Sequence, residues 1–203
     1  MLDRQRCPWA LQSEIERDYH DRVWGRPQHN DRALLAMLNL EGQQAGLSWY
    51  TVLSKIESLY RAYADFDPEV LVTYGDQQVA RLMQTEGIIR NQLKIRSVLA
   101  NAHAYVEVCH EFGSFDNYLW SFVNYQPIIN FWKSSEQVPA RTDLSESMSK
   151  DLKARGFKFV GPTTVYAFMQ ATGMVNDHLL TCPIREQTLG TRKAPASLLR
   201  NWG

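Results

Sequence analysis

The sequence predicts an all-α protein, and three observations support this fold class. Apolar residues recur three and four positions apart along most of the chain, capping residues and prolines stand at the starts of these stretches, and no stretch alternates in the manner of a β-strand. The 203 residues, 44% of them hydrophobic and 22% charged, are enough to bury one core. We expect a single domain over 1–187 and a flexible tail over 188–203, where no periodic pattern is found.

Capping residues mark the predicted helix starts in the first half of the chain. A polar residue followed by apolar residues at helical spacing predicts a helix, because its side chain accepts a backbone N–H that the first turn leaves free. On this basis helices are predicted from Asn30 to about Gly46, from Ser48 through Tyr63, from the pair Asp67 and Pro68, and from Asp76.

Three further helices are predicted in the second half. Each has a polar cap or a proline at its start, and proline suits the first helical position because its missing N–H is not needed there. These helices run from Asn91 through Val106, over 145–155 with Ser145 as the cap, and over 162–173 with Pro162 at the start and Gly173 at the end. The segment 126–143 lacks a pattern, so we expect an irregular crossing of the surface.

A short link, 85–89, joins two of the predicted helices, and Gly87 lets the chain turn sharply there. A helix that starts after such a link points backbone N–H groups outward, which favours a bound phosphate. An ordinary helix–helix turn is the better interpretation if the link is considered by itself. The stretches 81–96 and 150–158 each carry three excess positive charges, which is more typical of a solvated helix face than of a DNA contact.

Composition excludes several classes of protein. With 22 basic and 22 acidic side chains, the chain cannot coat nucleic acid by charge alone, although a basic face balanced elsewhere is compatible with these counts. The longest apolar run, 33–38, is far too short to span a membrane. No apolar segment follows the charged start of the chain, so we expect no signal peptide and a cytoplasmic location.

Two pairs of residues at opposite ends of the chain have the chemistry of metal ligands. His178 and Cys182 are separated by three residues, and Cys7 and His20 would supply the other half of a set of two cysteines and two histidines. A tetrahedral structural zinc binds such a set, and four protein ligands leave no open position for activating water. Spacing alone is equally compatible with chance. Cys109 lies in an apolar helical pattern and is expected to be an inert core thiol.

Glu41 is a carboxylate on a leucine-rich predicted helix, and it is followed by amides, two glycines and a tryptophan. It could lie on the solvent face at the end of the helix or point into a cleft of the protein. Aromatic residues that could line such a cleft lie near Glu41 or near the start of the chain, although most tryptophans belong to cores. They are Trp9, Tyr19, Trp24 and Trp49.

Several blocks of sequence are long enough to identify a protein family. The longest are LEGQQAGLSW at 40–49 and RGFKFVG at 155–161. Shorter blocks contain Arg6-Cys7 with Trp9, Tyr19-His20-Asp21 with Trp24-Gly25, Gly87-Ile88-Ile89-Arg90, Leu119-Trp120-Ser121-Phe122-Val123-Asn124, and Gly173 with Val175-Asn176-Asp177-His178. In this order, over roughly residues 5–182, the sequence resembles the DNA-3-methyladenine glycosylase I family, the constitutive enzymes of bacterial alkylation repair.

The resemblance implies a helix-hairpin-helix DNA glycosylase fold, with the hairpin motif at about 76–110 and a zinc clamp joining the two ends of the chain. It assigns one structural zinc to Cys7, His20, His178 and Cys182. It assigns catalysis to Glu41 and Tyr19, base binding to Trp49, Trp24 and Trp9, and the grip on the DNA backbone to Gly87, Ile88 and Ile89. We add Arg90 and Lys158 as positive charges beside the hairpin, and Gly46 and Leu47 as candidates for the residue that wedges into the duplex.

The implied activity is the flipping of N3-methyladenine out of double-stranded DNA and hydrolysis of its N-glycosidic bond, which leaves an abasic site. Free 3-methyladenine is then the product, no membrane is a partner, and a monomer is expected. N3-methyladenine in DNA is a cation, so it leaves without being protonated. Aromatic faces attract such a cation by about 0.5–2 kcal/mol each, and Glu41 would add negative potential.

The sequence departs from the family pattern at the hairpin and after Cys182. The hairpin has one glycine where related repair enzymes often have two, and the chain after Cys182 has no identified counterpart. The residue four positions past Gly87 is Asn91 and not lysine, so no lyase activity is expected, and Asp116 stands in a loop-like context without an assigned role. The alternatives are a helix-hairpin-helix glycosylase for another lesion and a zinc-stapled DNA-binding module without activity, which an intact Glu41 with its aromatic residues disfavours.

Overall fold

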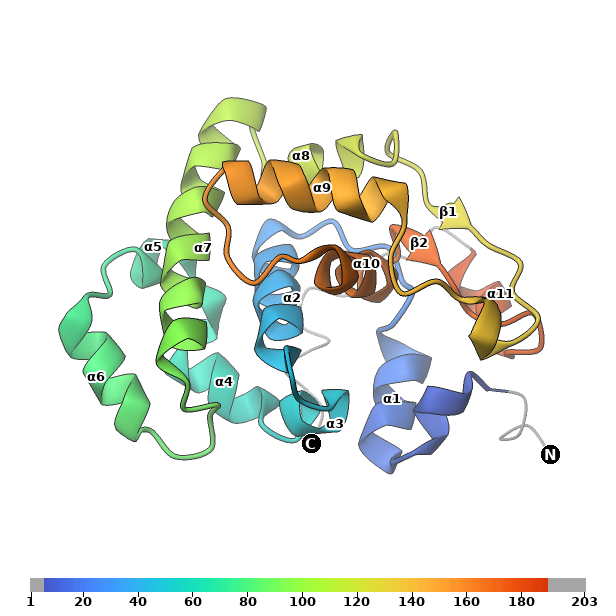
Figure 1. The fold of residues 1–203 in the computed structure, drawn as a ribbon, viewed down its shortest axis with the longest axis horizontal. Helices are drawn as coiled ribbons and strands as arrows, with labels where there is room; N and C mark the ends of the chain where they lie inside the picture. Colours follow the sequence, from blue (N-terminus) through green and yellow to red (C-terminus); the bar gives the residue numbers. More distant parts are fainter. Residues whose placement is uncertain (1–5, 190–203) are drawn as a thin grey trace.

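The structure, a computed structural model, describes residues 6–189 and is mainly helical (Figure 1). Two two-residue strands and several single turns of 3-10 helix (η) complete it. In chain order the elements are η2 (Pro8–Leu11), α1 (Glu14–Arg22), α2 (Asp31–Gln44), α3 (Trp49–Leu53), α4 (Ile56–Ala62), η3 (Ala64–Phe66), α5 (Pro68–Leu71), α6 (Asp76–Gln84), α7 (Gln92–Phe112), α8 (Phe115–Ser121), β1 (Ile128–Ile129), η4 (Ser135–Gln137), α9 (Asp143–Ala154), α10 (Pro162–Ala171), β2 (Val175–Asn176) and α11 (Arg185–Thr188).

Two of the predicted capping residues, Asn30 and Asn91, begin helices as expected. Asn30 accepts the backbone N–H of Ala33 at 2.9 Å and starts α2. Asn91 accepts that of Lys94 at 3.1 Å and starts α7, the longest helix of the described chain. Each side chain replaces a hydrogen bond that the first helical turn cannot make internally, so the predictions for α2 and α7 are confirmed.

Two predicted helices differ in their limits. The helix predicted from Ser48 through Tyr63 is two helices, because α3 ends at Leu53 and α4 begins at Ile56. Ser145 does not cap α9. The cap is Thr142, whose hydroxyl accepts the Ser145 N–H at 3.2 Å while the Ser145 hydroxyl accepts the Thr142 N–H at 2.9 Å. This reciprocal pair moves the helix start toward the N-terminus by one turn.

Helices α1 and α8 and the two strands lie where no such element is predicted above. Asp116 belongs to the first turn of α8 and not to a loop, and its Oδ1 is 2.8 Å from Nδ1 of His29. The strands pair in parallel, Ile128 with Val175 and Ile129 with Asn176. A two-residue strand cannot show the alternation by which strands are predicted, and the rest of 126–143 is irregular apart from η4.

Helix α2 lies in the middle of the molecule, and the other helices surround it (Figure 1). It contacts α10, α7, α8 and α3, and α9 packs along α10 on its far side. The helices α4, α5 and α6 lie on the α7 side, whereas α1 and α11 lie on the opposite side. Across residues 6–189, no helix is long and apolar enough to cross a membrane.

Two smaller expectations need correction. Cys109 packs against the core from α7, and burial raises the pKa of its thiol, but the residue is only half-buried. Thr188, placed above in the flexible tail, is 4% exposed, and its hydroxyl accepts a hydrogen bond from Asn176 Nδ2 at 2.8 Å. The remainder of the predicted tail, from 190 to 203, lies outside the described residues.

Gly173 joins α10 to β2 at a point where two backbone segments meet. Its φ is +70°, and a Cβ there would lie 2.4 Å from the carbonyl carbon of Arg26 and from the nitrogen of Pro27. We predict that Gly173→Ala destabilises the fold by roughly 2–4 kcal/mol, the sum of left-handed strain and a backbone clash. Urea unfolding followed by circular dichroism measures this loss.

The matched control is Gly113→Ala. Gly113 has a similar φ of +81°, but the nearest atom to an added Cβ is Asn117 Nδ2 at 3.9 Å. This variant should lose about 1 kcal/mol from strain alone. Equal losses in the two variants would show that the close approach at Gly173 contributes nothing.

Candidate functional site

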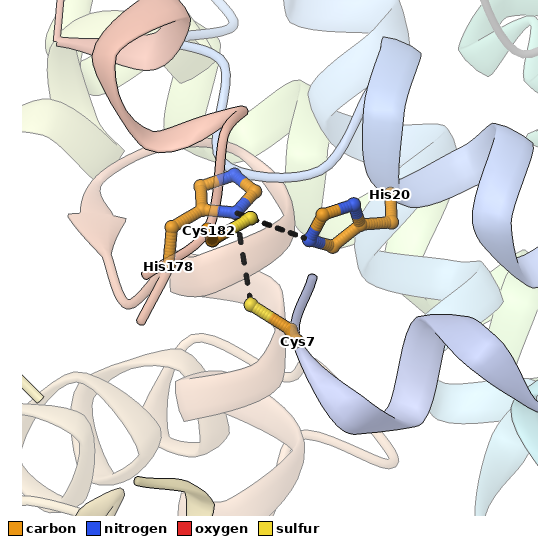
Figure 2. Close-up of side chains that lie close together, drawn as sticks. All are labelled: Cys7, His20, His178 and Cys182. Carbon is orange, nitrogen blue, oxygen red and sulfur yellow. Dashed lines mark hydrogen bonds between the residues drawn. The ribbon is translucent and has the colours of Figure 1, made fainter. Parts of the chain in front are cut away.

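The two ends of the described chain meet at four buried side chains with metal-ligand chemistry (Figure 2). Cys7 precedes η2, His20 lies on α1, His178 follows β2, and Cys182 precedes α11. Their ligand atoms all lie within 4.8 Å of one another. Cys182 Sγ is 3.5 Å from both His20 Nε2 and His178 Nδ1, and Cys7 Sγ is 3.8 Å from His178 Nδ1. The sequence therefore predicted the members of this cluster correctly.

The cluster has the dimensions and the surroundings of a metal site. Two sulfurs and two nitrogens around a tetrahedral ion would lie about 3.3–3.8 Å apart, given bonds of about 2.3 and 2.0 Å. The outward ring nitrogens are held in place: His20 Nδ1 is 2.8 Å from Asp21 Oδ1, and His178 Nε2 is 3.2 Å from the carbonyl oxygen of Trp24. Such bonds fix the ring so that the other nitrogen faces the ion. The cluster could therefore hold a metal ion.

The pKa values of the cluster residues are consistent with metal binding. Burial lowers the pKa of His178, which favours the neutral imidazole that binds a metal. The sulfur of Cys182 and burial raise the pKa of the Cys7 thiol. Two neighbouring buried thiols therefore resist ionising together, and a bound cation would remove that resistance. Both cysteines are free of disulfides.

A row of aromatic rings leads from the cluster to a cavity. The Trp24 ring lies against both histidine rings, with centroids 5.8 and 4.7 Å apart. Trp9 follows at 5.2 Å from Trp24, Tyr19 at 6.2 Å from Trp9, and Trp49 at 5.2 Å from Tyr19. The cluster and the cavity wall are thus connected by a continuous series of ring contacts.

The cavity has a volume of about 580 Å³. Its walls come from η2 and α1, the end of α2, the start of α3, one face of α10 and the irregular segment around Pro139. The structure brings together at this cavity all five residues that the sequence analysis placed in a pocket: Trp9, Tyr19, Trp24, Glu41 and Trp49. The indole Nε1 of Trp49 is buried and has no acceptor within the described chain.

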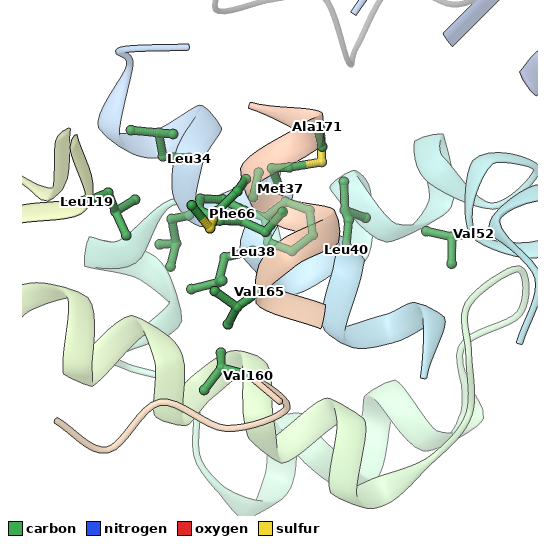
Figure 3. Packing of buried hydrophobic residues seen from close by; sticks show 14 of the residues in the cluster. Leu34, Met37, Leu38, Leu40, Val52, Phe66, Leu119, Val160, Val165 and Ala171 are labelled. Carbon is green, nitrogen blue, oxygen red and sulfur yellow. The ribbon is translucent and has the colours of Figure 1, made fainter. Parts of the chain in front are cut away.

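Glu41 is buried and does not lie on a solvent face. It is 5% exposed and lies near the C-terminal end of α2, where Leu38 and Leu40 belong to the buried hydrophobic cluster (Figure 3). Within residues 6–189 it forms no hydrogen bond or ion pair. Burial therefore raises the pKa of Glu41 to about 8. Burial, together with the charge of Glu41, also raises the pKa of Tyr19.

A second carboxylate at the cavity was given no role from the sequence. Asp177 is 2% exposed and accepts four hydrogen bonds. Its Oδ1 accepts from Asn130 Nδ2 at 2.7 Å and Trp132 Nε1 at 2.8 Å, and its Oδ2 accepts from the hydroxyl of Tyr166 at 2.6 Å and Gln170 Nε2 at 2.8 Å. Asp177 thereby fixes the α10 wall to the segment after β1. The sequence did contain a signal for this role, because Asp177 is a charged residue between the apolar residues Val175 and Leu179.

The hairpin residues do not line the cavity. Gly87 has a φ of +80°, and an added Cβ would lie 2.6 Å from Ser58 Oγ, so the link packs closely against α4. Ile88 is 5% exposed and anchors the hairpin through its side chain. The backbone N–H groups of residues 87–90 donate to no acceptor in the described part of the chain.

The remaining residues predicted to contact DNA lie at two other places. Gly46, with a φ of +74°, and Leu47, 40% exposed, form the loop after α2. Lys158 is exposed, and its backbone N–H and carbonyl bond to the side chain of Asn101, in the middle of α7 and not at the hairpin.

Part of the basic excess in the two stretches noted above is neutralised internally. Arg96 pairs with Asp76 at 2.7 Å, and Arg155 pairs with Glu111 at 2.7 Å and with Asp151. The solvated-face interpretation holds for exposed residues such as Arg96, Lys150 and Lys153. It is wrong for Lys94, which is buried.

Known proteins resemble this chain over most of its length. The sequence profile of the family described as methyladenine glycosylase matches residues 9–186. A protein of Haemophilus influenzae named DNA-3-methyladenine glycosylase is 45% identical, over 89% of this chain and 97% of that protein. DNA-3-methyladenine glycosylase 1 of Escherichia coli strain K12 is 44% identical, over 88% and 95%. A solved structure described as showing how 3-methyladenine DNA glycosylase I of Staphylococcus aureus recognises 3-methyladenine is 37% identical, with a TM-score of 0.86 over 88% and 95%.

Burial of Glu41 has a consequence for stability. With its pKa raised to about 8 in the folded state, Glu41 holds a proton that the unfolded chain has already released above about pH 4.5. Stability is therefore lost as the pH rises from about 4.5 to 8. We predict that Glu41→Gln stabilises the fold by roughly 3 kcal/mol at pH 7, since 2.5 pH units at 1.36 kcal/mol each are removed.

Urea unfolding of wild type and variant at pH 5 and pH 8 tests this. The gain from Glu41→Gln should be small at pH 5 and large at pH 8. The control is Glu107→Gln, at an exposed position of α7, which should leave stability unchanged at both values. A Glu41→Gln gain that is the same at pH 5 and pH 8 would contradict the buried-acid account.

Proposed function

This chain belongs to the methyladenine glycosylase family, and we propose that it removes N3-methyladenine from double-stranded DNA by hydrolysing the N-glycosidic bond, leaving an abasic site. The observation that carries this proposal is a buried carboxyl group without an ionic partner, Glu41, at an aromatic cavity of about 580 Å³. The names of the relatives, which attach this activity to proteins 44–45% identical, support it.

The chemistry needs little more than such a cavity. N3-methyladenine carries its positive charge in the duplex, so the base is already a good leaving group. Aromatic rings attract a flat cation, and we assign this role to Trp49, Trp24 and Trp9. Entry of the cation lowers the raised pKa of Glu41, and the resulting carboxylate stabilises the positive charge that develops on the sugar. Neutral adenine would leave Glu41 protonated and gain no charge interaction.

Tyr19 is the second residue to which we assign a catalytic role. Its ring lies between those of Trp9 and Trp49, and its pKa is raised by burial and by Glu41. Tyr19 therefore remains a neutral phenol at the cavity, and its hydroxyl donates to Met37 Sδ at 3.9 Å. It keeps the space beside Glu41 closed to bulk water, which strengthens the interaction between carboxylate and cation.

Binding of the duplex would use the hairpin and the loop after α2. The free N–H groups of residues 87–90 suit a phosphate at the start of α7, and the exposed Arg90 adds positive charge there. The target base must leave the stack to reach the cavity. Leu47, exposed beside Gly46, suits the role of the side chain that fills the vacated space.

We propose hydrolysis without lyase activity. A lyase needs an unprotonated lysine that reaches the sugar, and Lys94, which follows the hairpin, has its Nζ engaged with two carbonyl oxygens. Asp116 contacts His29 and does not line the cavity. We also propose a monomer in the cytoplasm, because nothing in this chemistry requires a second copy, and one domain that extends at least to Thr188.

The metal of the Cys7, His20, His178 and Cys182 cluster is proposed to be one structural zinc. Two thiolates and two imidazoles are the set that tetrahedral zinc binds. Zinc with four protein ligands supplies cohesion between the chain ends and no activated water. The ligands themselves keep Trp24 and Trp9 in place against the cavity.

Zinc prediction: the purified protein contains one zinc per chain, and Cys182→Ser loses it. The variant should melt at a lower temperature, because both ends of the chain lose their common attachment. Metal analysis and thermal unfolding measure the two effects. Cys109→Ser, which removes the half-buried cysteine of α7, is the control and should retain its zinc. A folded wild-type protein without zinc would remove the clamp from the proposal.

Pocket prediction: Glu41→Gln slows the excision of N3-methyladenine from methylated duplex DNA by about tenfold to a hundredfold. The methylated nucleotide keeps its charge over this pH range. The rate of excision by the wild type, measured with DNA below saturation, should therefore rise with pH and level off near pH 8 as Glu41 ionises. The variant should show no such rise. Single-turnover release of the base between pH 6 and pH 9 measures both, and a variant as active as wild type would exclude Glu41 from the site.

Stacking prediction: Trp49→Ala weakens binding of free 3-methyladenine by about 1–3 kcal/mol, because one aromatic face of the cavity is lost. Zinc content should not change, since Trp49 does not contact the cluster residues. Titration calorimetry measures the affinity, and metal analysis provides the control. Unchanged affinity would mean that the base lies elsewhere in the cavity.

A further inference from the structure

Lys94 is a buried cation with an unusual set of partners. It lies in the first turn of α7 and is 5% exposed. Its Nζ donates to the carbonyl oxygens of Gln43 and Ala45, both at 2.7 Å. No carboxylate of the described residues pairs with it. The ammonium group is thus held entirely by the backbone at the end of α2.

This arrangement gives acceptors to the Lys94 ammonium group and donors to carbonyl groups at the end of α2. The last carbonyl groups of a helix lack N–H donors and carry the negative end of the helix dipole. A buried ammonium group, whose pKa is lowered by burial, needs such acceptors to keep its charge. A reciprocal bond strengthens the connection, because Gln43 Nε2 donates to the Lys94 carbonyl oxygen at 3.2 Å.

The two segments joined by Lys94 are those to which we assign contact with DNA. On the α7 side, Lys94 closely follows the hairpin 87–90. On the α2 side, the bond to the Ala45 carbonyl ends one residue before Gly46, around which no atom lies within 4 Å of an added Cβ. Residues 45–48 are all exposed. The loop that presents Leu47 therefore has few packing contacts, and the Lys94 bond fixes its start.

We propose that Lys94 is a positioning residue for extrusion of the target base. By holding the loop 45–47 at a fixed place relative to the hairpin, it makes the phosphate grip and the Leu47 side chain act on the same stretch of duplex. Lys94 does not line the cavity, so it acts through the loop and not on the base. This inference rests on the proposed function.

A purely structural role for Lys94 makes a different prediction. If Lys94 only stabilised the fold, its removal would slow excision equally for every substrate. If it positions the loop, removal matters when the base must be forced out of a stacked pair, and matters less when the base is unpaired and leaves the stack easily. Free base binding, which needs no extrusion, should not change.

The experiment compares Lys94→Met, of similar length but without donors, with wild type. Both are assayed in single-turnover excision on one methylated strand, once paired with its complement and once with the methylated adenine opposite an abasic analogue. We expect Lys94→Met to slow excision about tenfold or more on the paired duplex, but less than about threefold at the unpaired base. The affinity for free 3-methyladenine, from titration calorimetry, should stay within about twofold of wild type. Lys94→Arg, which keeps a cation with donors, should recover most of the loss.

Val98→Ala is the control for stability. Val98 is fully buried on the same helix, one turn further along, and its truncation weakens packing without touching the α2 carbonyls. At a matched loss of melting temperature it should not distinguish the two substrates. Equal slowing by Lys94→Met on both substrates, weaker base binding, no slowing, or the same selectivity in Val98→Ala would each overturn the inference. Wild-type protein that releases no base from either substrate would instead overturn the proposed function.

Discussion

Helix α2 has no solvent face between residues 33 and 43, and the rest of the fold is arranged to cover it. A helix buried on every side needs neighbours all around, and α10, α7, α8 and α3 supply them. Close approach is part of this, since an added Cβ at Gly42 would lie 3.1 Å from the Phe159 side chain. The end of α2 is consequently rigid, so the side chains that lie there have defined positions.

Two ionisable groups lie at the end of α2, and they differ in whether hydrogen bonds compensate their burial. Lys94 reaches the end of α2 and donates to the carbonyl oxygens of Gln43 and Ala45. Glu41, one turn earlier, has no such compensation, and its pKa rises to about 8. A carboxyl group that is costly to ionise in the empty cavity becomes favourable to ionise when a cation enters. Under the proposed function, this cost in stability is the source of selectivity for a charged base, so function and stability oppose each other at Glu41.

The opposite wall of the cavity depends on the chain ends. Cys7 and His20 bring η2 and α1 against His178 and Cys182, and the rings of Trp24, Trp9 and Tyr19 pack in sequence from that cluster to Trp49. The N-terminal segment makes one wall, and α10 with Asp177 makes another. Cohesion at the cluster therefore controls how the aromatic rings face Glu41.

The sequence by itself determined the helical class, most helix starts, and the identity of the metal-ligand set and of the pocket residues. These depend on local capping chemistry, such as Asn30 and Asn91, or on side-chain types found in specific sequence blocks. Only the tertiary structure decided whether Glu41 faces solvent or protein, because helical periodicity does not show that α2 is covered on all sides. It also decided the roles of Asp177 and Lys94, whose partners lie far from them in sequence or belong to the backbone of another helix. Long-range packing sets the solvation of each charge, and that solvation cannot be obtained from neighbours in the chain.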